Sequence, residues 1–153
     1  MDWLGLGHFA TALLAMGTGA VVVLNAKGTL FHRWMGRLYA SSMLLLNLTA
    51  LAIYDLFGGF GPFHVAAIGS LVTIVIGVAA AWRRRPGWRV RHAYWMSWSY
   101  AGLLAAAVSE STTRYFQFDF GWSVTLSTVV VLTAGGLLIN RLVPSALRPG
   151  NRR

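Results

Sequence analysis

The amino-acid sequence predicts an all-α integral membrane protein with five transmembrane helices, and three observations lead to this prediction. Of the 153 residues, 56% are hydrophobic and only 11% are charged, whereas a soluble domain carries roughly a quarter charged residues. The apolar residues gather in five runs, each about as long as the roughly 20 residues that a helix needs to cross a bilayer. The basic residues flank these runs almost entirely on one side.

The five apolar runs set the expected helices. β-Barrel strands would alternate polar and apolar residues, which these runs do not do. Irregular backbone cannot face lipid, so helices remain as the structure that can span. Short connections such as residues 58–62 make consecutive helices antiparallel neighbours. We expect the spans near residues 4–24, 38–57, 63–82, 93–109 and 122–143.

Charge predicts the orientation. Five arginines lie between Trp82 and His92, and such a cluster between spans marks the cytoplasmic side. Alternation of the spans then places the N-terminus outside and the C-terminus inside. On the inside lie twelve of the thirteen basic residues, namely Lys27, Arg33, Arg37, Arg83, Arg84, Arg85, Arg89, Arg91, Arg141, Arg148, Arg152 and Arg153. On the outside lie Arg114 and the four acids Asp2, Asp55, Glu110 and Asp119.

Two segments of the chain resemble each other, which predicts the domain organisation. Gly7-His-Phe-Ala opens the first span and Phe63-His-Val-Ala opens the third. His32-Arg-Trp-Met and His92-Ala-Tyr-Trp-Met precede the second and fourth spans. We therefore expect a single transmembrane domain over residues 1–143, in which hairpins 4–57 and 63–109 form a pseudo-twofold four-helix bundle. Span 122–143 is an extra helix, and residues 144–153 form a basic cytoplasmic tail.

Several classes of function are disfavoured. The absence of cysteine removes disulfides, iron–sulfur clusters and thiol catalysis. The net charge of +9 would suit nucleic acid, but membrane flanks account for it, so no nucleic-acid partner is expected. No Ser-His-Asp grouping or phosphate loop is present, and the sequence assigns no catalytic residue.

The four histidines are the candidate cofactor ligands. His8 and His64 lie at the outer ends of spans one and three, while His32 and His92 lie at the inner ends of spans two and four. In a four-helix bundle these helices face each other diagonally, and bundle cofactors are held by facing helices. Each pair is therefore a candidate bis-histidine site for a haem b, because haem iron accepts imidazole.

Two other interpretations stay open. Imidazoles and carboxylates at the outer ends, His8, His64, Glu110 and Asp55, are ligands that suit zinc or another divalent metal. Glu110 is 18 residues beyond His92, about five helical turns, so both point to the same side of their helix. The third interpretation is a cofactor-free membrane subunit that binds a protein partner.

Three segments carry a resemblance: His32-Arg-Trp-Met-Gly-Arg37, Gly61-Pro-Phe-His64 and His92-Ala-Tyr-Trp-Met96. Over roughly residues 5–115 the chain resembles a family of small bacterial predicted membrane proteins of unknown function, which implies a multi-pass protein of the bacterial inner membrane. The alternating arrangement of histidines is also similar to that of the dihaem transmembrane cytochromes b. This similarity implies that the four histidines are axial ligands in an electron path across the bilayer, serving a redox partner.

Overall fold

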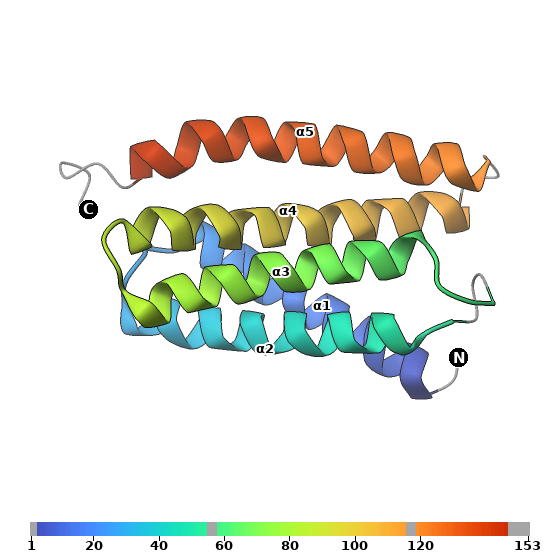
Figure 1. The fold of residues 1–153 in the computed structure, drawn as a ribbon, viewed down its shortest axis with the longest axis horizontal. Helices are drawn as coiled ribbons and strands as arrows, with labels where there is room; N and C mark the ends of the chain where they lie inside the picture. The colour runs from blue at the N-terminus through green and yellow to red at the C-terminus, as the bar shows by residue number, and fades with distance from the viewer. Residues whose placement is uncertain (1–2, 55–57, 116–118, 147–153) are drawn as a thin grey trace. The chain divides into compact units, whose positions relative to one another are not determined.

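The protein consists of five long α-helices in a computed structural model that describes residues 3–54, 58–115 and 119–146. These residues contain no β-strand, which confirms the all-α fold class. The helices follow one another along the chain with short connections (Figure 1). They are α1 (Trp3–Leu24), α2 (Leu30–Ala52), α3 (Pro62–Arg83), α4 (Trp88–Tyr115) and α5 (Phe120–Ala146).

Three of these helices are long and apolar enough to cross a membrane. They are α1, α3 and the Phe120–Pro144 part of α5. Each keeps most of its large apolar side chains exposed, as Leu13, Val75 and Leu126 illustrate. Exposed apolar surface on that scale is stable only when something other than water covers it, and lipid does so for a membrane helix.

Helix α2 begins earlier than the apolar run suggests. It starts at Leu30 rather than near residue 38, because Thr29 caps it: the Thr29 side chain accepts a hydrogen bond of 3.0 Å from the His32 N–H. His32, Arg33 and Arg37 consequently lie on the helix, ahead of the predicted span near residues 38–57. The helix ends at Ala52, and residues 55–57, including Asp55, lie outside the described part of the chain.

The chain divides into two compact units, Met1–Val75 and Ile76–Arg153, and the boundary falls within α3. In the first unit α1 packs against α2. The contact is built largely from small or polar residues, which allow helix backbones to approach closely. The buried residues are Ala15, Thr18 and Gly19 of α1 and Tyr39, Ser42, Met43, Leu46 and Asn47 of α2.

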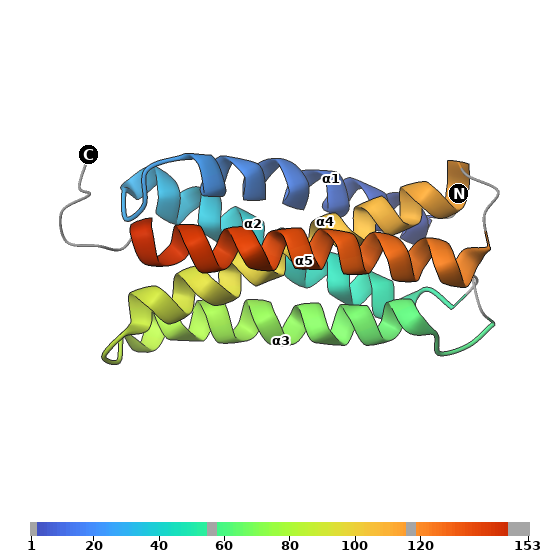
Figure 2. The ribbon, with the colours of Figure 1, turned by 90° about the horizontal axis from the view of Figure 1, so that it is seen from above.

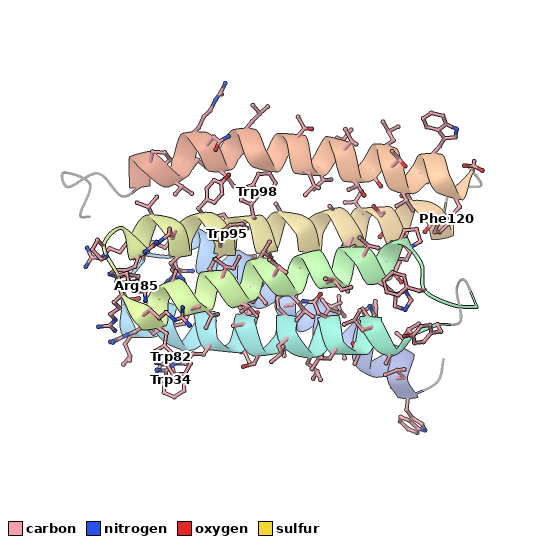
Figure 3. All side chains as sticks on the ribbon, in the orientation of Figure 1. Trp34, Trp82, Arg85, Trp95, Trp98 and Phe120 are labelled. Atoms are coloured by element: carbon pink, nitrogen blue, oxygen red, sulfur yellow. The ribbon has the colours of Figure 1, made fainter. Side chains whose placement is uncertain are left out.

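In the second unit α4 packs against α5, and small residues again set the distance between the helices. A Cβ added to Gly135 would lie only 3.0 Å from the Cβ of Ala101. A Cβ on Gly136 would lie 3.0 Å from the Trp98 ring, which points toward α5 (Figure 3). Glycine at these two positions therefore admits the facing side chains of α4.

The C-terminal end of α3 also packs on α4. A Cβ on Gly77 would lie 2.7 Å from the sulfur of Met96. The Met96 side chain of α4 therefore occupies the space that a side chain at position 77 of α3 would need. A short turn joins the two helices (Figure 2). The four-helix bundle and the assignment of residues 1–143 to one domain stay predictions from the sequence.

Candidate functional site: the four histidines

His8 is held by a hydrogen bond between the two helices of the first unit. Its Nδ1 lies 3.0 Å from Oγ1 of Thr49 on α2. The single hydroxyl proton of Thr49 is directed to its own helix, toward the carbonyl oxygens of Leu45 at 3.0 Å and Leu46 at 2.9 Å. With that proton on a backbone carbonyl, Thr49 accepts from His8, and Nδ1 carries the ring proton. In the neutral imidazole Nε2 then bears the lone pair that a metal ion would use.

His92 is likewise held through its Nδ1, by a hydrogen bond within the second unit. Its Nδ1 lies 2.8 Å from the carbonyl oxygen of Gly77 on α3. A carbonyl only accepts, so Nδ1 carries the proton and Nε2 bears the lone pair. A backbone carbonyl holding Nδ1–H is the usual support of a histidine that binds a metal through Nε2. The ring also lies 6.4 Å from that of Trp88, one turn earlier in α4.

His64 has the opposite arrangement. It is only 3% exposed at the start of α3, and its Nδ1 accepts a 3.1 Å hydrogen bond from the N–H of Gly61. Nε2 must then carry the proton of the neutral ring, and it has no hydrogen-bond partner in the described part of the chain. The rings of Tyr54 and Phe60 lie 4.7 and 5.0 Å from the imidazole. In this conformation His64 offers no lone pair to a metal.

His32 occupies the first turn of α2, where its backbone N–H bonds to the cap Thr29. It belongs to the first unit and His92 to the second, and each is positioned by neighbours in its own unit. The His32–His92 pair, which would join the two units, therefore stays a prediction. The His8–His64 pair, whose members both belong to the first unit, also stays a prediction. The structure adds that Nδ1 of His8 and of His92 faces an oxygen atom, whereas Nδ1 of His64 accepts a hydrogen bond from an N–H.

No cluster suited to a divalent metal is found in the described ranges: no three His, Cys, Asp or Glu residues lie close enough to hold an ion. Glu110 is exposed on α4 in the second unit, whereas His8 and His64 belong to the first. Asp55 lies outside the described residues. The metal site of His8, His64, Glu110 and Asp55 thus stays a prediction.

A buried hydroxyl cluster between α4 and α5 was not anticipated from the sequence. Ser109 is 1% exposed, and its Oγ lies 2.7 Å from that of Ser127 and 3.1 Å from Oγ1 of Thr128. Ser127 donates to the carbonyl of Ser123 at 2.6 Å, so it accepts from Ser109. The sequence signal is the four-residue spacing of Ala101, Ala105 and Ser109, which places small residues on one face of α4.

Long helices with apolar exposed faces, three of them able to span a bilayer, define a helical integral membrane protein. The chain belongs to the family described as "Predicted membrane protein (DUF2306)", which matches residues 5–147. This match confirms the family resemblance carried by the three histidine-containing segments. No curated protein and no solved structure matches the chain.

Proposed function

We propose that this protein is a small b-type haem protein that transfers electrons in the membrane, with His92 as an axial ligand. The observation that supports the proposal is the 2.8 Å hydrogen bond from His92 Nδ1–H to the Gly77 carbonyl. It fixes both the tautomer and the orientation of the ring before any ligand arrives, which lowers the cost of binding. On the topology argument from the sequence, His32 is the expected second ligand.

The residues of the chain would act as a scaffold. Gly77 holds the His92 ring through its carbonyl, and the same glycine leaves room for Met96, so α4 lies close enough for that bond to form. The apolar surroundings of membrane helices exclude water from the cofactor and help set its potential. The haem itself supplies the one-electron chemistry when it is bound.

A second haem at His8 and His64 has less support. His8 already forms a hydrogen bond through Nδ1 to Thr49, as a ligand that binds through Nε2 would. His64 would first have to release the Gly61 N–H from its Nδ1. Breaking that bond leaves a buried donor unsatisfied, at a cost of about 1–3 kcal/mol. We therefore place the first haem at His92, beside the arginine-rich turn between α3 and α4. A relay across the whole bilayer would require the outer haem as well.

We further propose that all five helices span the bacterial inner membrane, with the N-terminus outside. Helices α2 and α4 have 23 and 28 residues, enough for the roughly 20 that a span needs. Arg33 and Arg37 of α2 and Arg89 and Arg91 of α4 lie within the first turns of their helices, where they reach the interface, and Arg114 lies at the opposite end of α4. Cysteines introduced singly at Ser111 and Arg85 test the orientation. A membrane-impermeant thiol reagent applied to intact cells should label Ser111→Cys and spare Arg85→Cys.

The decisive experiment on function is an absorption spectrum of the detergent-purified protein, oxidised and then reduced with dithionite. A Soret band that shifts on reduction, with sharp α bands, is expected. His92→Gly should remove it, and added imidazole should restore it by filling the vacated position. His64→Ala is the matched control. Nδ1 of His64 accepts a hydrogen bond, so its Nε2 carries the proton, and loss of this histidine should leave the first haem in place.

Two results would end the haem proposal: a flat visible spectrum from cells supplied with haem, or an unchanged spectrum in His92→Gly. Elemental analysis of the same sample then separates the remaining interpretations. About one zinc per chain, lost in Glu110→Ala, would favour the metal site. No metal at all would favour a cofactor-free subunit, to be sought with its partner in native membranes.

A further inference from the structure

The turn between α3 and α4 concentrates positive charge on an exposed surface. Residues 82–92 contain no acidic side chain, and the five arginines are all exposed. Figure 3 shows Arg85 at the turn between α3 and α4. Uncompensated arginines attract an anionic partner. We call this segment, Trp82 to His92, the arginine turn.

The backbone of the arginine turn is held in an unfavourable conformation at one arginine. Arg84 follows the last residue of α3 with φ of 47°, and its N–H bonds to the Ala80 carbonyl at 3.2 Å. This is the left-handed helix cap that glycine usually occupies, because a side chain is strained there. Gly87, with φ of 74°, meets the same requirement without strain. An arginine retained where glycine fits better suggests that its side chain serves a purpose.

That side chain takes part in an ordered arrangement around Trp88. The guanidinium carbons of Arg84 and Arg89 lie 5.9 and 5.6 Å from the centre of the Trp88 ring. Both distances are within the range of a cation–π interaction. Arg91 donates from Nη2 to the Pro86 carbonyl at 3.1 Å, which ties the turn together. The two guanidinium groups on Trp88 are therefore preorganised by one ring.

An apolar surface adjoins this charge. Trp82 is 86% exposed, and a shallow hollow is lined by Ala79, Trp82 and Arg83. Tryptophan is enriched where a membrane protein meets the lipid headgroups. A surface that is cationic at the tip of the turn and apolar along the last turn of α3 matches the two ends of a phospholipid: its phosphate and the beginning of its acyl chains.

From these observations we infer that the arginine turn binds the headgroup phosphate of an anionic phospholipid, with Arg84 and Arg89 as its principal ligands. Guanidinium groups bind phosphate through paired N–H donors, and anionic leaflets attract basic segments next to a span. This inference goes beyond the haem proposal and does not depend on it. It needs only that the turn lies at a membrane surface.

Native mass spectrometry of the full chain in detergent, titrated with lipid, tests the inference. Dioleoyl-phosphatidylglycerol should bind more tightly than dioleoyl-phosphatidylcholine. Arg84→Gly should weaken binding of the anionic lipid about five-fold, since one arginine near a membrane surface has about that effect. The same change should leave the melting temperature in detergent equal or higher, because glycine relieves the strain at φ 47°. Loss of affinity together with retained stability would identify a binding residue.

Three further arms complete the experiment. Arg89→Gln, which leaves the left-handed position untouched, should weaken the same binding to a similar extent. Arg141→Gln is the matched control, an exposed arginine on α5 outside the turn, and should bind the anionic lipid like the parent. Inorganic phosphate at the lipid's concentration should not displace it.

The inference is overturned if both lipids bind equally, if Arg84→Gly and Arg89→Gln keep the parent's affinity, or if free phosphate displaces the lipid. The absorption spectrum of the variants separates this test from the previous one. Both variants should retain any haem bound by the parent. If the lipid experiment fails but the haem spectrum is present, the haem proposal stands. If the protein shows no haem spectrum but binds the anionic lipid through Arg84 and Arg89, the lipid site stands.

Discussion

Nδ1 of His92 lies 2.8 Å from the carbonyl oxygen of Gly77, on the helix that precedes it. The bond depends on close approach of α3 and α4, which Gly77 permits because a Cβ there would lie 2.7 Å from the sulfur of Met96. One glycine thus sets both the helix packing and the orientation of the candidate ligand.

Gly77→Ala should destabilise the protein by about 1–3 kcal/mol, because the added methyl group overpacks the contact with Met96. Unfolding in increasing SDS, followed by circular dichroism, provides the measurement. Gly69→Ala is the control on the same helix: nothing lies within 4 Å of the added Cβ, so it should be neutral or slightly stabilising. Met96→Ala combined with Gly77→Ala should recover part of the loss, and no recovery would contradict the packing explanation.

Thr49→Val should cost about 1 kcal/mol, because it removes the acceptor for His8 Nδ1–H while keeping the side-chain volume. A double-mutant cycle with His8→Phe should give a coupling free energy of at least about 0.5 kcal/mol. Thr11→Val is the control, since Thr11 donates only to the Gly7 and His8 carbonyls of its own helix. Additive effects of Thr49→Val and His8→Phe would argue against the bond.

Gly135→Ala should destabilise the pairing of α4 and α5, because the new Cβ would lie 3.0 Å from that of Ala101. A loss of about 1 kcal/mol or more is expected, since the helices must move apart. Adding Ala101→Gly should restore the distance. Gly102→Ala, with nothing within 4 Å, provides the control on α4. Equal effects at Gly135 and Gly102 would contradict the assigned interface.

Ser109→Ala should destabilise the protein by about 0.6 kcal/mol and by no more than about 1.7 kcal/mol, the average and the maximum measured for hydrogen bonds between membrane helices. It removes the hydroxyl that lies 2.7 Å from Ser127. Ser111→Ala is the matched control, because Ser111 is exposed and bonds only to the Ala107 carbonyl of its own helix. If the two substitutions have the same small effect, the buried cluster contributes nothing.

The sequence by itself determined that this is a helical membrane protein and where along the chain its charged residues lie. Apolar runs of spanning length predicted helices that the structure contains, because a backbone in lipid must satisfy its hydrogen bonds internally. Helix ends were predicted less well. Thr29 extends α2 backward through a local cap, and a hydropathy run does not register such caps.

The tertiary structure decided which atom each described histidine meets at Nδ1. The histidines look alike in sequence, but the atom opposite Nδ1 differs among three of them: a hydroxyl for His8, a carbonyl for His92 and an N–H for His64. For His8 and His92 that atom comes from another helix, at sequence separations of 41 and 15 residues. For His92 the close approach of α3 and α4 at Gly77 places it there, and such an approach follows from helix packing rather than from hydropathy.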